Sequence, residues 1–209
     1  MLGKSLIEVA TDLGIMIDLS HANEKTFWDI ISLVKTLKSS GKSPFIFASH
    51  SNCRNLFDKQ VAVFLESQRE SLKKNLFYLR NLSDEQLLAI KELGGVIGIV
   101  SHKRLSLLRP DQMDIIKEEL KDTYIQSLKD QFIHLKELFG DTNNIILSSD
   151  DMGYESHVDY AYYTNCNFFS YPTISKEWKM FLGNCNFSKV EIESMMYNNF
   201  KKQILNRYK

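Results

Sequence analysis

The sequence predicts an α/β fold in which four short parallel strands are covered by helices. Four apolar runs bounded by glycine or polar residues are typical of buried parallel strands, and they lie at residues 15–19, 45–49, 96–100 and 145–149. The longer segments between them carry apolar residues every three or four positions, as amphipathic helices do. This alternation favours one parallel sheet. The same alternation of strands and helices is compatible with an open doubly wound sheet and with part of a (β/α)8 barrel.

Local sequence signals predict one helix before the first strand and a second helix after it. Apolar side chains recur at helical spacing over residues 5–13, and Gly14 is expected to end that helix. Asn23 is a residue type that favours the N-cap position, so the second helix is predicted to begin after it. That helix is expected to end within the polar stretch 39–41. The second strand follows.

The middle of the chain carries two clear helix signals and one weak signal. Residues 83–86 read Ser-Asp-Glu-Gln, a capping box that predicts a helix before the third strand. A longer helix is predicted from Asp111 to the glycine at position 140, ahead of the fourth strand. Residues 56–79 form only a loose amphipathic pattern, either a lid or a helical insertion near 59–79.

The C-terminal part is predicted to be an aromatic loop followed by two helices. Residues 154–171 are aromatic and loop-like, and they are expected to form a wall over the strand ends. Residues 174–182 carry a helical apolar pattern. Ser188 and Glu191 form a second capping box, so one further helix is expected from there through Ile204.

Composition narrows the class of protein. With 209 residues, 44% of them apolar, the chain is long enough to bury a core and is expected to form one domain over residues 1–209. Its net charge of zero gives no electrostatic footprint for nucleic acid or an anionic membrane. No apolar run approaches the ~20 residues that span a bilayer, and the N-terminus lacks the order of a signal peptide, which predicts a cytoplasmic location. Three cysteines without metal-type spacing suggest reduced thiols.

Residues able to bind a metal or move a proton stand at three of the predicted strand ends. Two strands are followed by Ser-His, at His21 and His50, and the fourth ends at Asp150. Loops after the carboxyl ends of parallel strands build the active sites of α/β proteins. Since neutral imidazole is the commonest metal ligand, His21 and His50 could reach one zinc-sized ion.

Each of these residues also has a purely structural interpretation. Either Ser-His pair could instead end its strand by hydrogen bonding to the backbone. Asp150 could be a ligand, a general base or an amine-binding group, or it could close an Asx turn before Gly153. Arg80 could clamp a substrate carboxylate or be a solvated surface arginine. His134, within the long predicted helix, is more simply a packed or exposed helix residue.

Five motifs in order resemble the membrane dipeptidase family, also called renal dipeptidases. They are the stretches 14–21 (Gly-Ile-Met-Ile-Asp-Leu-Ser-His), 48–52 (Ala-Ser-His-Ser-Asn), 80–86 (Arg-Asn-Leu-Ser-Asp-Glu-Gln), 94–99 (Gly-Gly-Val-Ile-Gly-Ile) and 149–150 (Ser-Asp). The resemblance covers nearly the whole chain and implies a partial TIM barrel of the amidohydrolase type, about half of the complete one. It also implies hydrolysis of the peptide bond of dipeptides by a metal-bound hydroxide shared by two zinc ions.

The resemblance assigns roles to four residues of this chain. His21 and His50 match the two histidines that bind the second metal. Arg80 matches the arginine that receives the C-terminal carboxylate of the dipeptide. Asp150 matches the strand-end aspartate credited with substrate contact and proton transfer.

The sequence departs from the family pattern around the first metal. The family holds that metal with an N-terminal His-x-Asp pair and a bridging glutamate, and no His-x-Asp pair precedes His21. The chain is therefore expected to be the C-terminal part of a dipeptidase, with at most one partial zinc site, completed by an N-terminal partner chain, by missing residues or in a homodimer. The alternatives are an inactive remnant of a split or truncated gene and a peptide-binding module built on Arg80 and residues 154–171.

Overall fold

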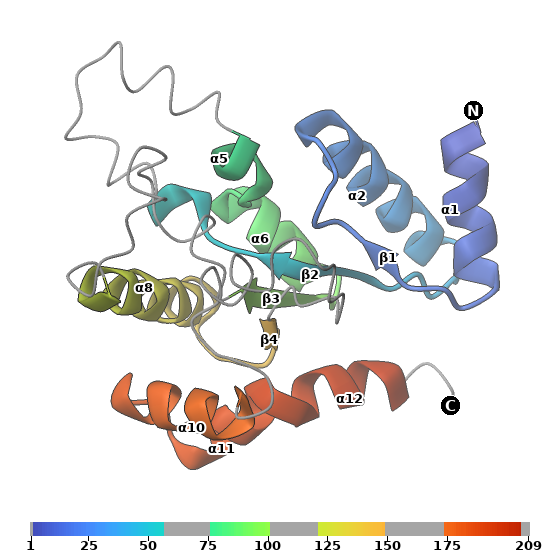
Figure 1. Ribbon diagram of the computed structural model, residues 1–209. Coiled ribbons are helices and arrows are strands. Elements are labelled where there is room, and N and C mark those ends of the chain that lie inside the picture. The colour runs from blue at the N-terminus through green and yellow to red at the C-terminus, as the bar shows by residue number, and fades with distance from the viewer. Residues whose placement is uncertain (1, 57–75, 101–120, 149–173, 206–209) are drawn as a thin grey trace, which may run out of the picture.

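A computed structural model of the chain describes residues 2–56, 76–100, 121–148 and 174–205. Figure 1 shows a small central sheet with helices above and below it in that view. The four strands of the described residues form one sheet.

The sheet contains four parallel strands in the order of the sequence. They are β1 (Ile17–Asp18), β2 (Ile46–Ser51), β3 (Val96–Val100) and β4 (Ile145–Ser148). Each strand pairs in parallel with the next one along the chain. A doubly wound sheet reverses its strand order at a switch point, whereas a barrel adds each strand on the same side as the last. The order β1-β2-β3-β4 therefore follows the barrel pattern and confirms the predicted parallel α/β fold.

The helices of the described part surround this sheet. They are α1 (Leu2–Asp12), α2 (Glu24–Ser39), α5 (Leu76–Arg80), α6 (Asp84–Glu92), α8 (Lys121–Phe139), α10 (Ile174–Asn184), α11 (Lys189–Glu193) and α12 (Asn199–Leu205). In Figure 1, α2 and α6 lie above the sheet and α10, α11 and α12 lie below it.

The predicted helix starts are confirmed at three N-termini. The side chain of Asn23 accepts a hydrogen bond from the backbone N–H of Thr26 at 2.9 Å. Ser83 and Ser188 each begin a helix with a complete capping box. In each case an oxygen of a side chain satisfies a backbone N–H that has no partner within the helix.

The core is built from the strands and the inward faces of the helices. β3 is buried along its whole length, as expected of a strand covered on both faces. Phe132 of α8 packs edge-on against Trp178 and Phe181 of α10, with ring centroids 5.5 and 6.1 Å apart. These aromatic contacts attach the C-terminal helices to the rest of the molecule.

Two helices show features that the sequence did not predict. Leu6 of α1 and Leu13, which follows that helix, are 67% and 69% exposed. The helix predicted from Ser188 to Ile204 is interrupted by a π-helical turn, η3 (Ser194–Asn198), between α11 and α12. A π-helical turn closes its hydrogen bonds between residues five apart, and it adds one residue to the turn.

Several sequence predictions fall outside the described residues. They concern residues 57–75 of the loose amphipathic segment, residues 111–120 of the long predicted helix, the aromatic loop 154–171 and Asp150. Cys53 and Cys185 are both buried, and each is a free cysteine. None of the helices in the described ranges combines the length and the apolar composition that crossing a bilayer requires.

Candidate metal and substrate site at the strand ends

A bulge in β2 places His50 at the end of the sheet. Ala48 pairs with Ile97 and Ser51 with Ile99, so Ser49 and His50 together face the single residue Gly98 of β3. A bulge of this kind kinks the strand and redirects its side chains. A Cβ atom at position 98 would lie 2.2 Å from the carbonyl oxygen of Ser49, so only glycine allows the two backbones to approach this closely.

His21 and His50 come together at this end of the sheet. Their Nε2 atoms lie 3.0 Å apart, and their ring centroids are 4.9 Å apart. His50 is half-buried and His21 is exposed. Parallel neighbouring strands bring their carboxyl ends to one edge, which explains why residues 29 positions apart in the sequence meet there.

Arg80 completes a cluster of three side chains. Its Nη2 atom lies 3.2 Å from Nε2 of His50 and 3.4 Å from Nε2 of His21. A guanidinium group only donates hydrogen bonds, so it faces the lone pair of an imidazole nitrogen. Within the described part of the chain, the buried Nε atom of Arg80 has no hydrogen-bond partner.

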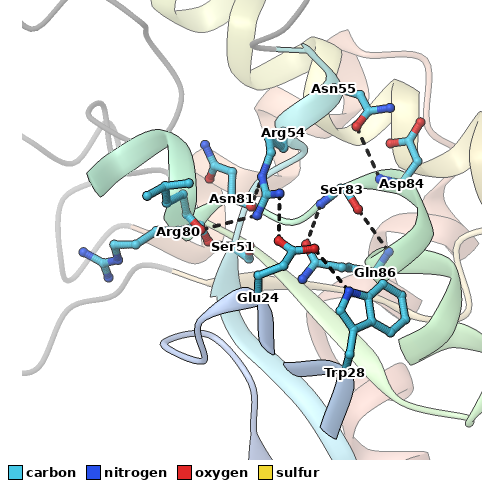
Figure 2. Close-up of polar contacts among 11 residues, drawn as sticks. Glu24, Trp28, Ser51, Arg54, Asn55, Arg80, Asn81, Ser83, Asp84 and Gln86 are labelled. Atoms are coloured by element: carbon cyan, nitrogen blue, oxygen red, sulfur yellow. Dashed lines mark hydrogen bonds and ion pairs between the residues drawn. The ribbon is translucent and has the colours of Figure 1, made fainter. Parts of the chain in front are cut away.

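The backbone that carries Arg80 is held by the segment that follows β2. Arg54 donates from Nε to the carbonyl oxygen of Asn81 at 2.9 Å and from Nη2 to that of Leu79 at 3.4 Å. Its Nη1 atom also forms an ion pair of 3.1 Å with Glu24 at the start of α2. Figure 2 shows Arg54 between these groups, with the guanidinium of Arg80 pointing away from them. Arg54 thus fixes the turn from which the Arg80 side chain extends.

Asp18, at the end of β1, accepts hydrogen bonds from two serines. Its Oδ1 atom receives the backbone N–H groups of Ser20 and Ser49, both at 3.0 Å, and the Ser20 hydroxyl at 2.8 Å. Its Oδ2 atom receives the Ser49 hydroxyl at 2.5 Å. The Oγ atom of Ser49 in turn lies 2.8 Å from Nδ1 of His50. A carboxylate, a hydroxyl and an imidazole therefore form a continuous chain that ends at the histidine pair.

These contacts also set the electrostatics of Asp18. Burial alone would raise the pKa of this carboxyl group, but the hydrogen bonds from Ser49 and Ser20 outweigh it and hold the pKa below its ordinary value. Asp18 is consequently an anion at neutral pH and acts only as an acceptor.

Asn52 joins the ends of β2 and β3 beyond the histidine. Its amide nitrogen donates to the carbonyl oxygen of Val100 at 3.3 Å, and its Oδ1 atom accepts from the Val100 N–H at 3.2 Å. Asn52 is fully buried. Its side chain satisfies the N–H and the C=O of Val100 in place of backbone groups of a neighbouring strand. This pairing keeps the bulge of β2 against β3.

The histidine pair has the donor chemistry of part of a zinc site. Imidazole nitrogens bind zinc at about 2.0–2.1 Å, so two that share one ion lie at most about 4 Å apart. The separation of 3.0 Å between the Nε2 atoms meets this condition. The described residues contain no group of three or more histidine, cysteine, aspartate or glutamate side chains that could hold an ion. Two imidazoles are thus the ligands that this part of the chain can offer.

The structure brings together three of the four residues singled out from the sequence. His21, His50 and Arg80 lie within hydrogen-bonding distance of one another. Asp150 lies outside the described residues. His134 is a packed helix residue, as expected, and its Nε2 atom lies 2.7 Å from Oδ1 of Asp84.

The sequence reasoning assigned no role to Asp18, Ser49 or Arg54. Asp18 stands two residues before Ser20 in the stretch Asp-Leu-Ser-His, a spacing that permits an Asx turn and could have marked it. No local signal identifies the contact between Asp18 and Ser49, because the two residues are 31 positions apart.

The chain is similar in sequence to curated proteins over part of its length. Curated relatives match only part of the chain: an uncharacterised protein encoded in the pqqA 5′ region of Klebsiella pneumoniae is 34% identical over 97 residues, which are 46% of this chain and 26% of that protein.

The solved structures that resemble this chain show a shared fold. A dipeptidase described as a metallopeptidase of family M19 superposes on 98% of the chain, with a TM-score of 0.60 and 22% identity. A metallopeptidase from Rhodobacter sphaeroides, bound to a phosphinate mimic of the dipeptide L-Ala-D-Ala, gives the same three values. The probable dipeptidase PvdM from Pseudomonas aeruginosa covers 99% of the chain, with a TM-score of 0.59 and 20% identity.

These structures match nearly all of this chain, but this chain matches only part of each of them. The chain spans about half of each of them, between 46% and 54% of their residues. The four parallel strands thus occupy part of a metallo-dipeptidase fold, as the predicted partial barrel requires. The family model for membrane dipeptidases, peptidase family M19, matches residues 1–200. Because that match covers most of the chain, the chain belongs to the membrane dipeptidase family.

Proposed function

We propose that this chain supplies the second-metal side of a zinc-dependent dipeptidase site. In this proposal His21 and His50 hold one zinc ion through their Nε2 atoms, and Arg80 receives the C-terminal carboxylate of a dipeptide. The observation that carries the proposal is the convergence of these three side chains, with both Nε2 atoms and the Nη2 atom within 3.4 Å of one another.

The residues of the chain would divide the work between binding and orientation. Arg80 would fix the carboxylate end of the substrate with charge-assisted hydrogen bonds, which favours peptides whose carboxylate is one residue from the scissile bond. Arg54 would hold the turn that carries Arg80, and Ser49 would orient His50. When bound, zinc supplies Lewis-acid polarisation of a carbonyl group and lowers the pKa of water. Asp150, by resemblance, would contact the substrate and transfer a proton.

A complete site of this kind requires more ligands than the described residues offer. Catalytic zinc normally has three protein ligands and one open position. The two imidazoles would therefore be joined by a His-x-Asp pair and a bridging glutamate, supplied by a partner chain or by residues outside this sequence. A homodimer is a third arrangement, in which residues of a second copy would complete the site.

The proposal is tested by measuring dipeptide hydrolysis with zinc present. The full chain is assayed alone and after mixing with a polypeptide that carries an N-terminal His-x-Asp pair and the bridging glutamate. With a partner chain we expect turnover only in the mixture, together with a complex of the two chains in size-exclusion chromatography. Turnover by the chain alone would instead indicate the homodimer. A folded, stable complex that binds zinc but does not cleave any dipeptide would contradict the proposal.

A second candidate is a non-catalytic remnant that keeps the histidines by descent. This candidate is favoured because the described residues offer only two metal-ligand side chains at the site, His21 and His50. The remnant is expected to bind less than one zinc ion per chain and to remain inactive with every completing polypeptide. Turnover by the mixture would exclude this candidate.

A further inference from the structure

We propose that Asp18 is a positioning residue for His50, acting through the hydroxyl group of Ser49. In this arrangement Asp18 and Ser49 hold the imidazole of His50 as the tautomer with a proton on Nδ1. The lone pair of Nε2 then faces His21. The proposal deepens the metal site described above, and it rests on the proposed function only for its effect on zinc binding.

The direction of each hydrogen bond follows from the donors available to Asp18. An ionised carboxylate has no proton, so every contact to it must be donated by the other group. The contact between Ser49 Oγ and Asp18 Oδ2 is 2.5 Å, which is typical of a hydroxyl that donates to a carboxylate. A serine has one hydroxyl proton, and Ser49 therefore directs it to Asp18.

The contact between the two serines does not alter this assignment. Ser20 Oγ lies 3.1 Å from Ser49 Oγ and 2.8 Å from Asp18 Oδ1. If Ser49 donated to Ser20 instead, two oxygen lone pairs would face each other at the 2.5 Å contact with Asp18. That repulsion makes the carboxylate the acceptor. Ser20 also accepts the backbone N–H of His50 at 3.1 Å, which fixes the backbone of the histidine.

The tautomer of His50 then follows. Because the Ser49 proton is directed to Asp18, Ser49 can only accept at its contact of 2.8 Å with Nδ1 of His50. The proton of that bond must come from the imidazole, so Nδ1 carries it. In a neutral imidazole the other nitrogen is then an acceptor. Nε2 lies 3.0 Å from Nε2 of His21 and 3.2 Å from the guanidinium of Arg80, where a ligand lone pair is needed.

The test is to observe the protonated nitrogen of His50 directly. Long-range proton–nitrogen correlation spectra of the ¹⁵N-labelled full chain are recorded without metal at about pH 8, where an unperturbed histidine is neutral. The His50 resonances are assigned from the spectrum of His50→Gln. We expect the Nδ1–H pattern for His50 in the wild-type chain.

Asp18→Asn is the decisive variant because it keeps the shape of the side chain. The asparagine Oδ1 atom can keep the three bonds that Asp18 Oδ1 accepts, while the Nδ2 amide donates to Ser49. Ser49 would then turn its own proton toward Nδ1 of His50, so we expect the pattern to change to Nε2–H. Asp29→Asn, an exposed α2 aspartate paired with Lys25, is the matched control and should leave the pattern unchanged.

The second measurement is zinc affinity, determined by competition with a chromophoric chelator for the chain with its completing polypeptide. Loss of an outer partner of a ligating histidine typically lowers metal affinity 10–100-fold, and we expect that loss in Asp18→Asn. An Nε2–H pattern in the wild type, or an unchanged pattern in Asp18→Asn, would overturn the inference. If neither protein binds zinc but the tautomer changes, the proposed function fails while the role of Asp18 stands.

Discussion

At the scale of single residues, the site depends on three side chains that come from different segments. His21 follows β1, His50 lies in the bulge of β2, and Arg80 ends α5. Among the described residues, no carboxylate lies within this group of nitrogen atoms, so these three side chains would be electropositive once a metal is bound. An anionic substrate group would offset that charge. The roles of Arg80 and the histidines can therefore be separated experimentally.

The substitution Arg80→Gln tests the carboxylate clamp. In the assembly with its completing polypeptide, we expect the KM for a dipeptide to rise about 10–100-fold, because a hydrogen bond to a charged group contributes about 1.5–3 kcal/mol. The zinc content should not fall, since Arg80 is not a ligand. A dipeptide amide, which lacks the carboxylate, is the matched control substrate and should react equally with both proteins. An equal loss for both substrates would contradict the clamp.

At the scale of secondary structure elements, the close approach of β2 and β3 decides where His50 points. The bulge requires Gly98, and Asn52 joins the two strands at their ends. Both features are internal to the sheet, so changes there should affect stability and the site together.

Gly98→Ala tests the bulge. The added methyl group would meet the carbonyl oxygen of Ser49 at 2.2 Å, and backbone atoms cannot yield as a side chain does. We expect a loss of about 1–3 kcal/mol in the free energy of unfolding, measured with urea, and weaker zinc binding. Gly183→Ala in α10 is the control, because a Cβ atom there meets nothing within 4 Å. It should be neutral or slightly stabilising. Equal stability of both variants would refute the close approach.

The N-terminus of α11 carries a pH-dependent contact. A hydrogen bond from Lys136 lowers the pKa of Glu191 below its ordinary value, and bonds from Ser188 help to outweigh the opposing effect of burial. The folded state therefore favours the ionised carboxylate. Its contribution to stability is present above about pH 4.5 and is lost as the pH falls through the lower pKa of the folded state.

Glu191→Gln measures this contribution, because glutamine can keep the capping box with Ser188 but not the ion pair. We expect the wild type to be more stable at neutral pH by a few tenths to about 1 kcal/mol, since both partners are partly exposed. Urea unfolding of both proteins at a series of pH values should show the difference vanishing in acid. A difference that grows toward low pH would have the wrong sign for this contact.

At the scale of the whole molecule, the sequence predicted the parallel α/β fold because its signals are local. Apolar runs mark the strands, and Asn23, Ser83 and Ser188 mark helix starts. The barrel-like order of the strands could not be derived from periodicity, because it depends on which strand pairs with which. Helical periodicity likewise does not determine whether an apolar row is covered, and Leu6 of α1 is 67% exposed.

The candidate site was predictable to a similar degree. His21 and His50 stand at strand ends, so a rule about parallel sheets finds them. Asp18 and Arg54 act through partners about 25 to 31 positions away, and no local pattern reveals such contacts. Arg80 was identified by resemblance to a family, and its approach to the histidines is a result of the fold.

In our proposal, His21 and His50 form the metal-binding side of a dipeptidase site. The most direct test measures bound zinc and dipeptide hydrolysis in parallel for the completed assembly carrying His50→Ala. His134→Gln, which changes the histidine paired with Asp84 on α8, is the matched control. We predict that His50→Ala loses hydrolysis and one zinc ion, while His134→Gln keeps both. Undiminished hydrolysis in His50→Ala would contradict the account.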